Sequence, residues 1–287
     1  MTAPNTSSQR IDALMAISSQ VYPILEQKHD GEIRARILLR RSITLVANAL
    51  RGGDSPSQAG LQFEAYLIHE LRHVDYGAYA SYCVLPKSHT RITVPDDLAT
   101  IANKYADVLR STMLADHSFE PDAIHALHLA ALAVPYARAH YPKLDAGKVA
   151  LYCLLHDLPE AYVGDVPTFN ISDDALQDKK AREAEALLAF RSDYGKKWPE
   201  LVAAVEAYEA LTDDEAAFVK AIDKNDPGYT HFRNGAHALK TVHNVHSAAA
   251  FHEQARANIA RTLPYAERFP LVLEDKYELT DRIATYI

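Results

Sequence analysis

Four ionisable residues lie in or beside an apolar segment, LLHDLPEAYVGDVPT, which runs from Leu154 to Thr168. His156 and Asp157 stand side by side among leucines, and Glu160 and Asp165 follow soon after. Burying such groups is costly unless something neutralises them. Imidazole nitrogens and carboxylate oxygens suit divalent transition metals, so the pattern favours a bound metal ion.

Two distant residues share the apolar setting of His156. On a helix, His156 follows Val149 and other apolar residues at spacings of three and four, which places it on a buried face. His125 stands above Leu129 in the same way, and Asp223 ends an apolar stripe of its own helix. A lone buried histidine is usually a hydrogen-bonded core residue. Several inward polar residues together favour a binding site.

A second string, HELRH at residues 69–73, matches the H-E-x-x-H pattern of zinc proteases. In that motif two histidines one helical turn apart hold the metal, and the glutamate activates water. The extended form needs a glycine three residues after the second histidine, but Tyr76 stands there. A zinc protease using His69 and His73 is therefore an alternative, and an amphipathic helix is the simpler interpretation.

The overall composition is that of a soluble globular protein. Of the 287 residues, 48% are hydrophobic and 24% charged, and the net charge of -8 argues against broad nucleic-acid binding. Cys83 and Cys153 lie among apolar neighbours and are expected to be free thiols in a reducing compartment. No signal peptide and no apolar run of about 20 residues is seen, so we expect a cytoplasmic protein without membrane association.

The sequence predicts an all-α fold without strands or internal repeats. Helical periodicity covers residues 11–25, 32–50, 58–84, 96–111, 123–140, 145–159, 174–194, 199–211, 213–224, 236–262 and the C-terminus. Loops are expected at 51–57 and 85–97, where glycine, proline and serine gather. A boundary near Pro95 would divide an N-terminal helical region of unknown role (1–95) from a functional domain with C-terminal helices (96–287).

The stretch from about residue 110 to 226 resembles an HD-domain phosphohydrolase, specifically the branch that contains bacterial 5'-deoxynucleotidases. The string HDLPEAYVGDVPT is similar to that branch through its acidic residues and its Gly-Asp-x-Pro-Thr turn. The family order of H, then HD, then a distant D matches His125, His156, Asp157 and Asp223. His125 is chosen over His128 because HALHLAALA matches the branch at that position. The resemblance implies that these four residues bind one divalent metal ion (Mn, Co, Zn, Fe or Ni) in a helical bundle.

The resemblance also implies catalytic and substrate-binding residues. Glu160 and Asp165 match the catalytic acidic positions of the branch, and Arg110 matches an arginine that contacts substrate. The branch commonly has tryptophan after that arginine, where this chain has Ser111. Lys180 could add a charge for phosphate, although a solvated surface lysine is the simpler interpretation.

The leading functional hypothesis is metal-dependent hydrolysis of phosphate from a small nucleotide, most of all a deoxynucleoside 5'-monophosphate. One acidic residue would orient or deprotonate water, and the other would protonate the leaving oxygen. A deoxynucleoside triphosphate triphosphohydrolase would use the same residues, and a non-catalytic nucleotide-binding or scaffold protein is a third hypothesis. The family is usually oligomeric, so the resemblance implies a homo-oligomer.

Overall fold

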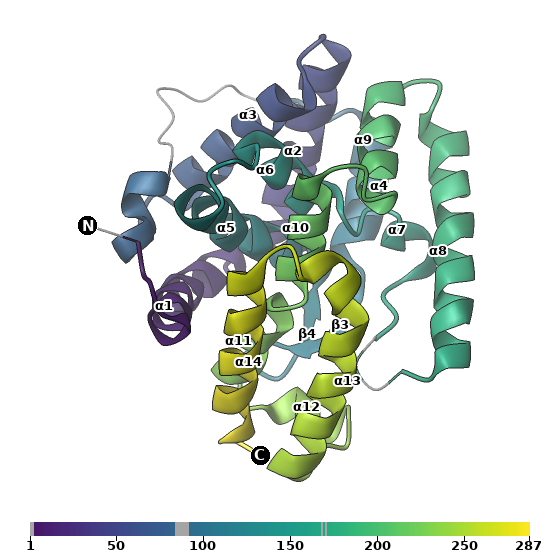
Figure 1. Cartoon of the computed structure of the whole chain (residues 1–287). Helices are drawn as coiled ribbons and strands as arrows, with labels where there is room; N and C mark the ends of the chain where they lie inside the picture. The colour runs from purple at the N-terminus through teal and green to yellow at the C-terminus, as the bar shows by residue number, and fades with distance from the viewer. Residues whose placement is uncertain (1–2, 84–91, 168, 170) are drawn as a thin grey trace.

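Helices account for most of the computed structural model, which describes residues 3–83, 92–167, 169 and 171–287 (Figure 1). The fold is all-α, as the sequence predicts. The α-helices are α1 (Ser7–Leu25), α2 (Arg34–Arg51), α3 (Pro56–Glu70), α4 (Asp96–Ala106), α5 (Asp122–His140), α6 (Ala146–Leu155), α7 (Glu160–Val163), α8 (Asp173–Tyr194), α9 (Pro199–Glu209), α10 (Asp214–Asp223), α11 (Asp226–Arg233), α12 (His237–Thr241), α13 (Ala248–Ala266) and α14 (Pro270–Ala284). A 3-10 helix, η1, covers Gly77–Tyr82.

Helices α6 and α10 begin at aspartates that cap their first turns. Asp145 accepts hydrogen bonds from the backbone of Gly147 and Lys148, and Asp213 accepts one from Ala216. A carboxylate at this position accepts hydrogen bonds from N–H groups that have no partner within the helix, and its negative charge interacts favourably with the positive end of the helix dipole. The caps therefore fix the first residues of α6 and α10. The other ends of these two helices place a histidine and an aspartate close together.

The helices before and after Pro95 share one apolar core. Helix α3 packs closely on α6, where a Cβ on Gly60 would lie 1.7 Å from the carbonyl oxygen of Gly147. Glycine is therefore required at this crossing. Arg10 of α1 donates to Asp275 of α14 at 2.8 Å, which joins the two ends of the chain. The domain boundary near Pro95 stays a prediction.

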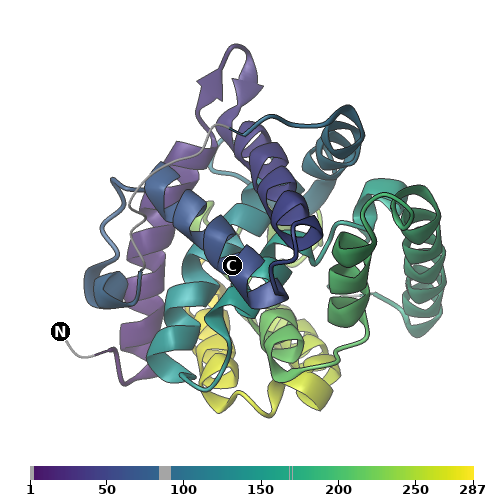
Figure 2. The ribbon, with the colours of Figure 1, turned by 90° about the horizontal axis from the view of Figure 1, so that it is seen from above.

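The outer parts of the molecule are visible when it is turned. Helices α8 and α9 lie together at the periphery, away from the helices at the centre (Figure 2). A short hairpin of β1 (Lys28–His29) and β2 (Glu32–Ile33) projects at the top of the same view. The later helices α13 and α14 pair with each other and cover α10 and α11 (Figure 1).

Several helix boundaries differ from the sequence prediction. The helix expected over 58–84 ends at Glu70, because the chain turns there and Asp75 accepts a hydrogen bond from the backbone of Gly77. The helix expected over 236–262 is broken into α12 and α13, the second of which Ser247 caps. Helix α11 is missing from the prediction. Of the loop expected over 85–97, residues 85–91 lie outside the described residues.

The prediction that the chain has no strands is wrong, because two short hairpins form. Besides β1 and β2, strand β3 (Leu109–Met113) pairs antiparallel with β4 (Phe119–Pro121). The helix expected over 96–111 therefore ends at Ala106, and Arg110 lies on a strand. Thr112 donates to the buried Glu120 at 2.6 Å, a contact between strands that periodicity does not reveal.

Within the described ranges, no helix is long and apolar enough to cross a membrane. Cys83 and Cys153 are free thiols, as predicted, and Cys153 is buried in α6.

Candidate metal centre

The four residues predicted to bind metal come together from three helices. His125 lies in α5, His156 caps the end of α6 with Asp157 after it, and Asp223 is the last residue of α10. His125 Nε2 lies 3.1 Å from His156 Nε2 and 3.1 Å from Asp223 Oδ1. Asp157 Oδ2 lies 2.9 Å from His156 Nε2 and 3.7 Å from His125 Nε2. Four potential ligand atoms thus point to one place.

The hydrogen bonds of the two imidazoles show what this place requires. His156 Nδ1 lies 3.0 Å from the carbonyl oxygen of Cys153, which only accepts, so Nδ1 carries the hydrogen. His125 Nδ1 lies 2.7 Å from Asp226 Oδ2 and donates in the same way. In neutral rings both Nε2 atoms then present lone pairs to each other and to Asp223. Such a convergence requires a positive charge within it.

Either a proton or a metal ion can supply that charge. Burial and Arg110 lower the pKa of His125, but the carboxylates of Asp226 and Asp223 raise it well above its ordinary value. Asp223 Oδ1 accepts no hydrogen bond within the described part of the chain. His125, His156 and Asp223 offer ligand atoms within 4.8 Å of one another. The donor set therefore fits a divalent transition metal.

Asp226 orients His125, and sequence reasoning missed it. Its Oδ1 lies 2.7 Å from His128 Nδ1, so one carboxylate holds two imidazoles. Burial opposes ionisation of Asp226, but His128 and His125 hold its pKa below the ordinary range. The two histidines of α5 differ in what they face. His128 Nε2 lies against Ser18 and not at the centre, where His125 Nε2 lies.

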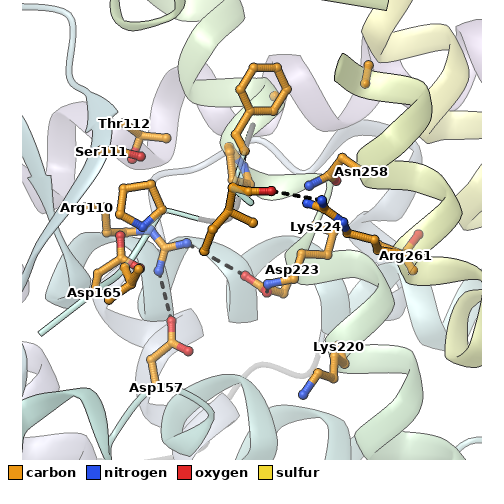
Figure 3. A pocket seen from close by; sticks show the side chains of 18 of the residues that line it. Arg110, Ser111, Thr112, Asp157, Asp165, Lys220, Asp223, Lys224, Asn258 and Arg261 are labelled. Carbon is orange, nitrogen blue, oxygen red and sulfur yellow. Dashed lines mark hydrogen bonds and ion pairs between the residues drawn. The ribbon is translucent and has the colours of Figure 1, made fainter. Parts of the chain in front are cut away.

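Arg110, predicted to bind substrate, contacts two carboxylates beside the centre. Its Nη1 lies 2.9 Å from Asp157 Oδ2 (Figure 3). The same atom lies 3.2 Å from Asp122 Oδ1. Asp122 is fully buried at the start of α5, and burial raises its pKa well above the ordinary value. In the sequence Asp122 carries only the signal of a helix start. Together with Asp157 and Glu160 it forms a second cluster of possible metal ligands, all of them carboxyl groups.

Glu160 and Asp165 both line the cavity next to the centre. Glu160 begins α7, and its buried Oε2 has no hydrogen-bond partner among the described residues. Burial raises the pKa of Glu160 well above its ordinary value, and the charges of Asp157 and Asp122 raise it further. Gly164 then adopts a φ of 73°, a left-handed conformation that turns the chain toward Asp165.

The cavity has a volume of about 390 Å³, within the range of about 300–1,000 Å³ that is typical for small molecules. Lys180 lines it, as does Lys179, whose Nζ lies 3.7 Å from Glu160 Oε1. Four further cations on its wall were missed from the sequence: Lys220, Lys224 and Arg261, which Figure 3 shows, and Lys276. The rest of the wall includes aromatic side chains from Phe169, His231, His243 and Phe251.

The H-E-x-x-H string lacks the helical geometry that a zinc-protease site needs. Helix α3 ends at Glu70, so His69 and His73 do not lie one turn apart on a helix. Glu70 pairs with Arg34 at 2.8 Å. The groups of metal-ligand residues found in the described chain do not include these histidines.

Comparison with known proteins identifies the family. The model of the family described as HD domain matches residues 102–265, more than half of the chain, and the chain belongs to that family. Among solved structures, it is similar to a predicted metal-dependent phosphohydrolase from Magnetospirillum magnetotacticum MS-1. The identity is 26% and the TM-score 0.52, over 66% of this chain and 90% of that one. No curated protein matches the chain.

Proposed function

We propose that the protein is a metal-dependent phosphohydrolase that acts on nucleotides, with deoxynucleoside 5'-monophosphates as its main substrates. The observation that carries this proposal is the convergence of two imidazole nitrogens and two carboxylates beside a cavity. Membership of the HD-domain family and similarity to a predicted metal-dependent phosphohydrolase support it. In this proposal His125, His156, Asp157 and Asp223 hold one divalent metal ion.

The residues around the centre suit hydrolysis at phosphorus. When bound, the metal ion lowers the pKa of a coordinated water from 15.7 toward about 7 and polarises a phosphoryl oxygen. Glu160, whose pKa is raised by burial and by nearby carboxylates, donates a proton to the leaving nucleoside oxygen. Asp165 orients and deprotonates the attacking water. The guanidinium of Arg110 stabilises the negative charge on phosphate.

Other parts of the cavity wall support a nucleotide as substrate. Phosphate requires cations, and Lys179, Lys220 and Lys224 line the cavity beside the centre. A nucleobase requires flat apolar contacts, which Phe169 and Phe251 can provide although Ser111 replaces the tryptophan of the deoxynucleotidase branch. The number of cations also supports a second candidate, hydrolysis of a deoxynucleoside triphosphate.

Product analysis tests the proposal and separates the two substrates. The metal-depleted protein would be supplied with Mn, Co, Zn, Fe or Ni and assayed for phosphate, pyrophosphate and inorganic triphosphate. Deoxynucleoside monophosphates are expected to yield phosphate, and Asp223→Ala should abolish the release. Release of inorganic triphosphate from triphosphates would favour the second candidate. No release by a protein that binds both metal and nucleotide would overturn the enzymatic proposal.

A further inference from the structure

A continuous set of buried hydrogen bonds connects His125 to helix α1. Asp226 Oδ2 lies 2.7 Å from His125 Nδ1, and Asp226 Oδ1 lies 2.7 Å from His128 Nδ1. His128 Nε2 in turn lies 2.8 Å from Ser18 Oγ. Ser18 belongs to α1, which precedes the residues that the family model matches.

The chemistry of the partners fixes the direction of these bonds. The Asp226 carboxylate only accepts, so both imidazoles donate to it through Nδ1. A neutral His128 then accepts at Nε2, and the hydroxyl of Ser18 is the donor. This arrangement leaves the Nε2 lone pair of His125 directed at the metal centre, and a hydrogen-bonded imidazole is held in that tautomer and orientation.

Burial makes each of these bonds hard to replace. Ser18 is 3% exposed, His128 0% and Asp226 1%, so solvent water cannot take the place of a lost partner. Tyr22, one turn after Ser18 on α1, packs its ring 4.2 Å from the His128 ring. Its hydroxyl lies 2.8 Å from Glu120, so the ring that fixes His128 is itself fixed. Helix α1 thus contacts His128 in two ways.

The order serine, histidine, aspartate also occurs in hydrolytic triads, where the serine attacks substrate. Ser18 is too buried for that role, and it is not among the residues that line the cavity.

We propose that Ser18, His128 and Asp226 are positioning residues that act on the metal centre through His125, and that α1 is therefore part of the active site. This inference rests on the metal-binding role of His125 in the proposed function. Its consequence is that changes in α1, far from the HD motif in sequence, alter metal affinity.

Metal binding by full-length variants tests the inference without any substrate. Dissociation constants for Co²⁺ would be measured by competition with a chelator, together with the visible absorption of bound Co²⁺. Asp226→Asn should weaken binding by about 10–100-fold, since an amide cannot accept from both imidazoles. Ser18→Ala should weaken it by about 5-fold, the value of one hydrogen bond, and both variants should shift the spectrum. Ser18→Thr keeps the hydroxyl and should restore wild-type binding.

Ser42→Ala is the matched control. Ser42 is buried in α2, and its hydroxyl has no hydrogen-bond partner in the described ranges, so its removal should leave the affinity unchanged. If Asp226→Asn does not fold, Ser18→Ala still provides the test. Wild-type affinity and spectrum in Ser18→Ala, with metal lost in His125→Ala, would overturn the positioning role alone. Metal retained in His125→Ala would overturn both this inference and the proposed metal centre.

Discussion

Arg110 Nη1 lies 2.9 Å from Asp157 Oδ2, so the cation proposed to bind substrate already contacts a proposed metal ligand. The same oxygen of Asp157 lies 2.9 Å from His156 Nε2. A phosphate bound at the metal centre would therefore lie beside the guanidinium. Arg110 also contacts the fully buried Asp122. Among the described residues it is the one cation within 4.0 Å of that carboxyl group.

Arg110→Lys is expected to weaken substrate binding while the metal stays bound. Lysine keeps the positive charge near the carboxylates but loses the planar fork that fits phosphate. We expect KM to rise about 10-fold or more, since hydrogen bonds between charged groups contribute about 1.5–3 kcal/mol. Arg191→Lys, which changes an exposed ion pair with Glu206, should leave KM unchanged. An unchanged KM in Arg110→Lys, measured by steady-state kinetics, would remove Arg110 from substrate recognition.

Glu160→Gln is expected to separate proton transfer from metal binding. Glutamine has the same shape but cannot act as an acid, so turnover should fall by about 10²–10⁴-fold with metal content and fold retained. The raised pKa of Glu160 means that the acidic form is present below that pKa and is lost as the pH rises through it. Turnover and metal content measured on one sample decide the matter. Wild-type turnover excludes the acid role, and metal loss makes Glu160 a ligand.

The double variant His69→Ala with His73→Ala is expected to keep both metal content and phosphohydrolase activity. Helix α3 ends between the two histidines, so they do not form the pair of ligands that a zinc protease needs. Elemental analysis of the purified variant provides the measurement. Loss of one metal ion per chain would show that these histidines bind metal after all.

His140 is expected to make the fold less stable in acid. Burial and the charge of Arg10 lower the pKa of His140 from 6.5 to about 4, and its Nε2 lies 2.9 Å from the hydroxyl of Tyr79. Because the folded state disfavours protonation, its stabilising contribution is present above pH 6.5 and is lost as the pH falls toward 4. With a discount for partial exposure, the loss at pH 5 is about 1 kcal/mol.

Urea unfolding at pH 7.5 and pH 5 measures this effect. His140→Gln keeps a hydrogen-bond acceptor for Tyr79 and does not titrate, so its free energy of unfolding should fall less between the two pH values. An equal fall in the variant and the wild type would show that His140 does not contribute.

The sequence predicts the parts of the centre whose chemistry is local. His156 and Asp223 stand out because each occupies an apolar helical stripe, and the HD-domain resemblance links them to His125. Asp226 and Asp122 carry no such signal, since an acidic residue at the start of a helix is ordinary. Their roles arise from partners that are close only after folding, and periodicity within one helix cannot reveal such contacts.

The same limit explains the errors in the fold. Long apolar segments such as α5 were predicted correctly as helices. The predicted start of α5 differs from the observed start by one residue. The β3–β4 hairpin was missed because its stability comes from pairing and from Thr112 with Glu120, which one strand alone does not show. Ser18 had no visible role for the same reason, since its partner His128 is distant in the chain.

The metal content of purified protein tests the central claim most directly. Inductively coupled plasma mass spectrometry would be applied to the wild type, His156→Ala, Asp223→Ala and the exposed-histidine control His29→Ala, after loading with Mn²⁺ or Co²⁺ and removal of excess ion. We expect one metal ion per chain in the wild type and in His29→Ala, and loss of both metal and phosphate release in the other two variants. Full metal occupancy in His156→Ala and Asp223→Ala would contradict the account.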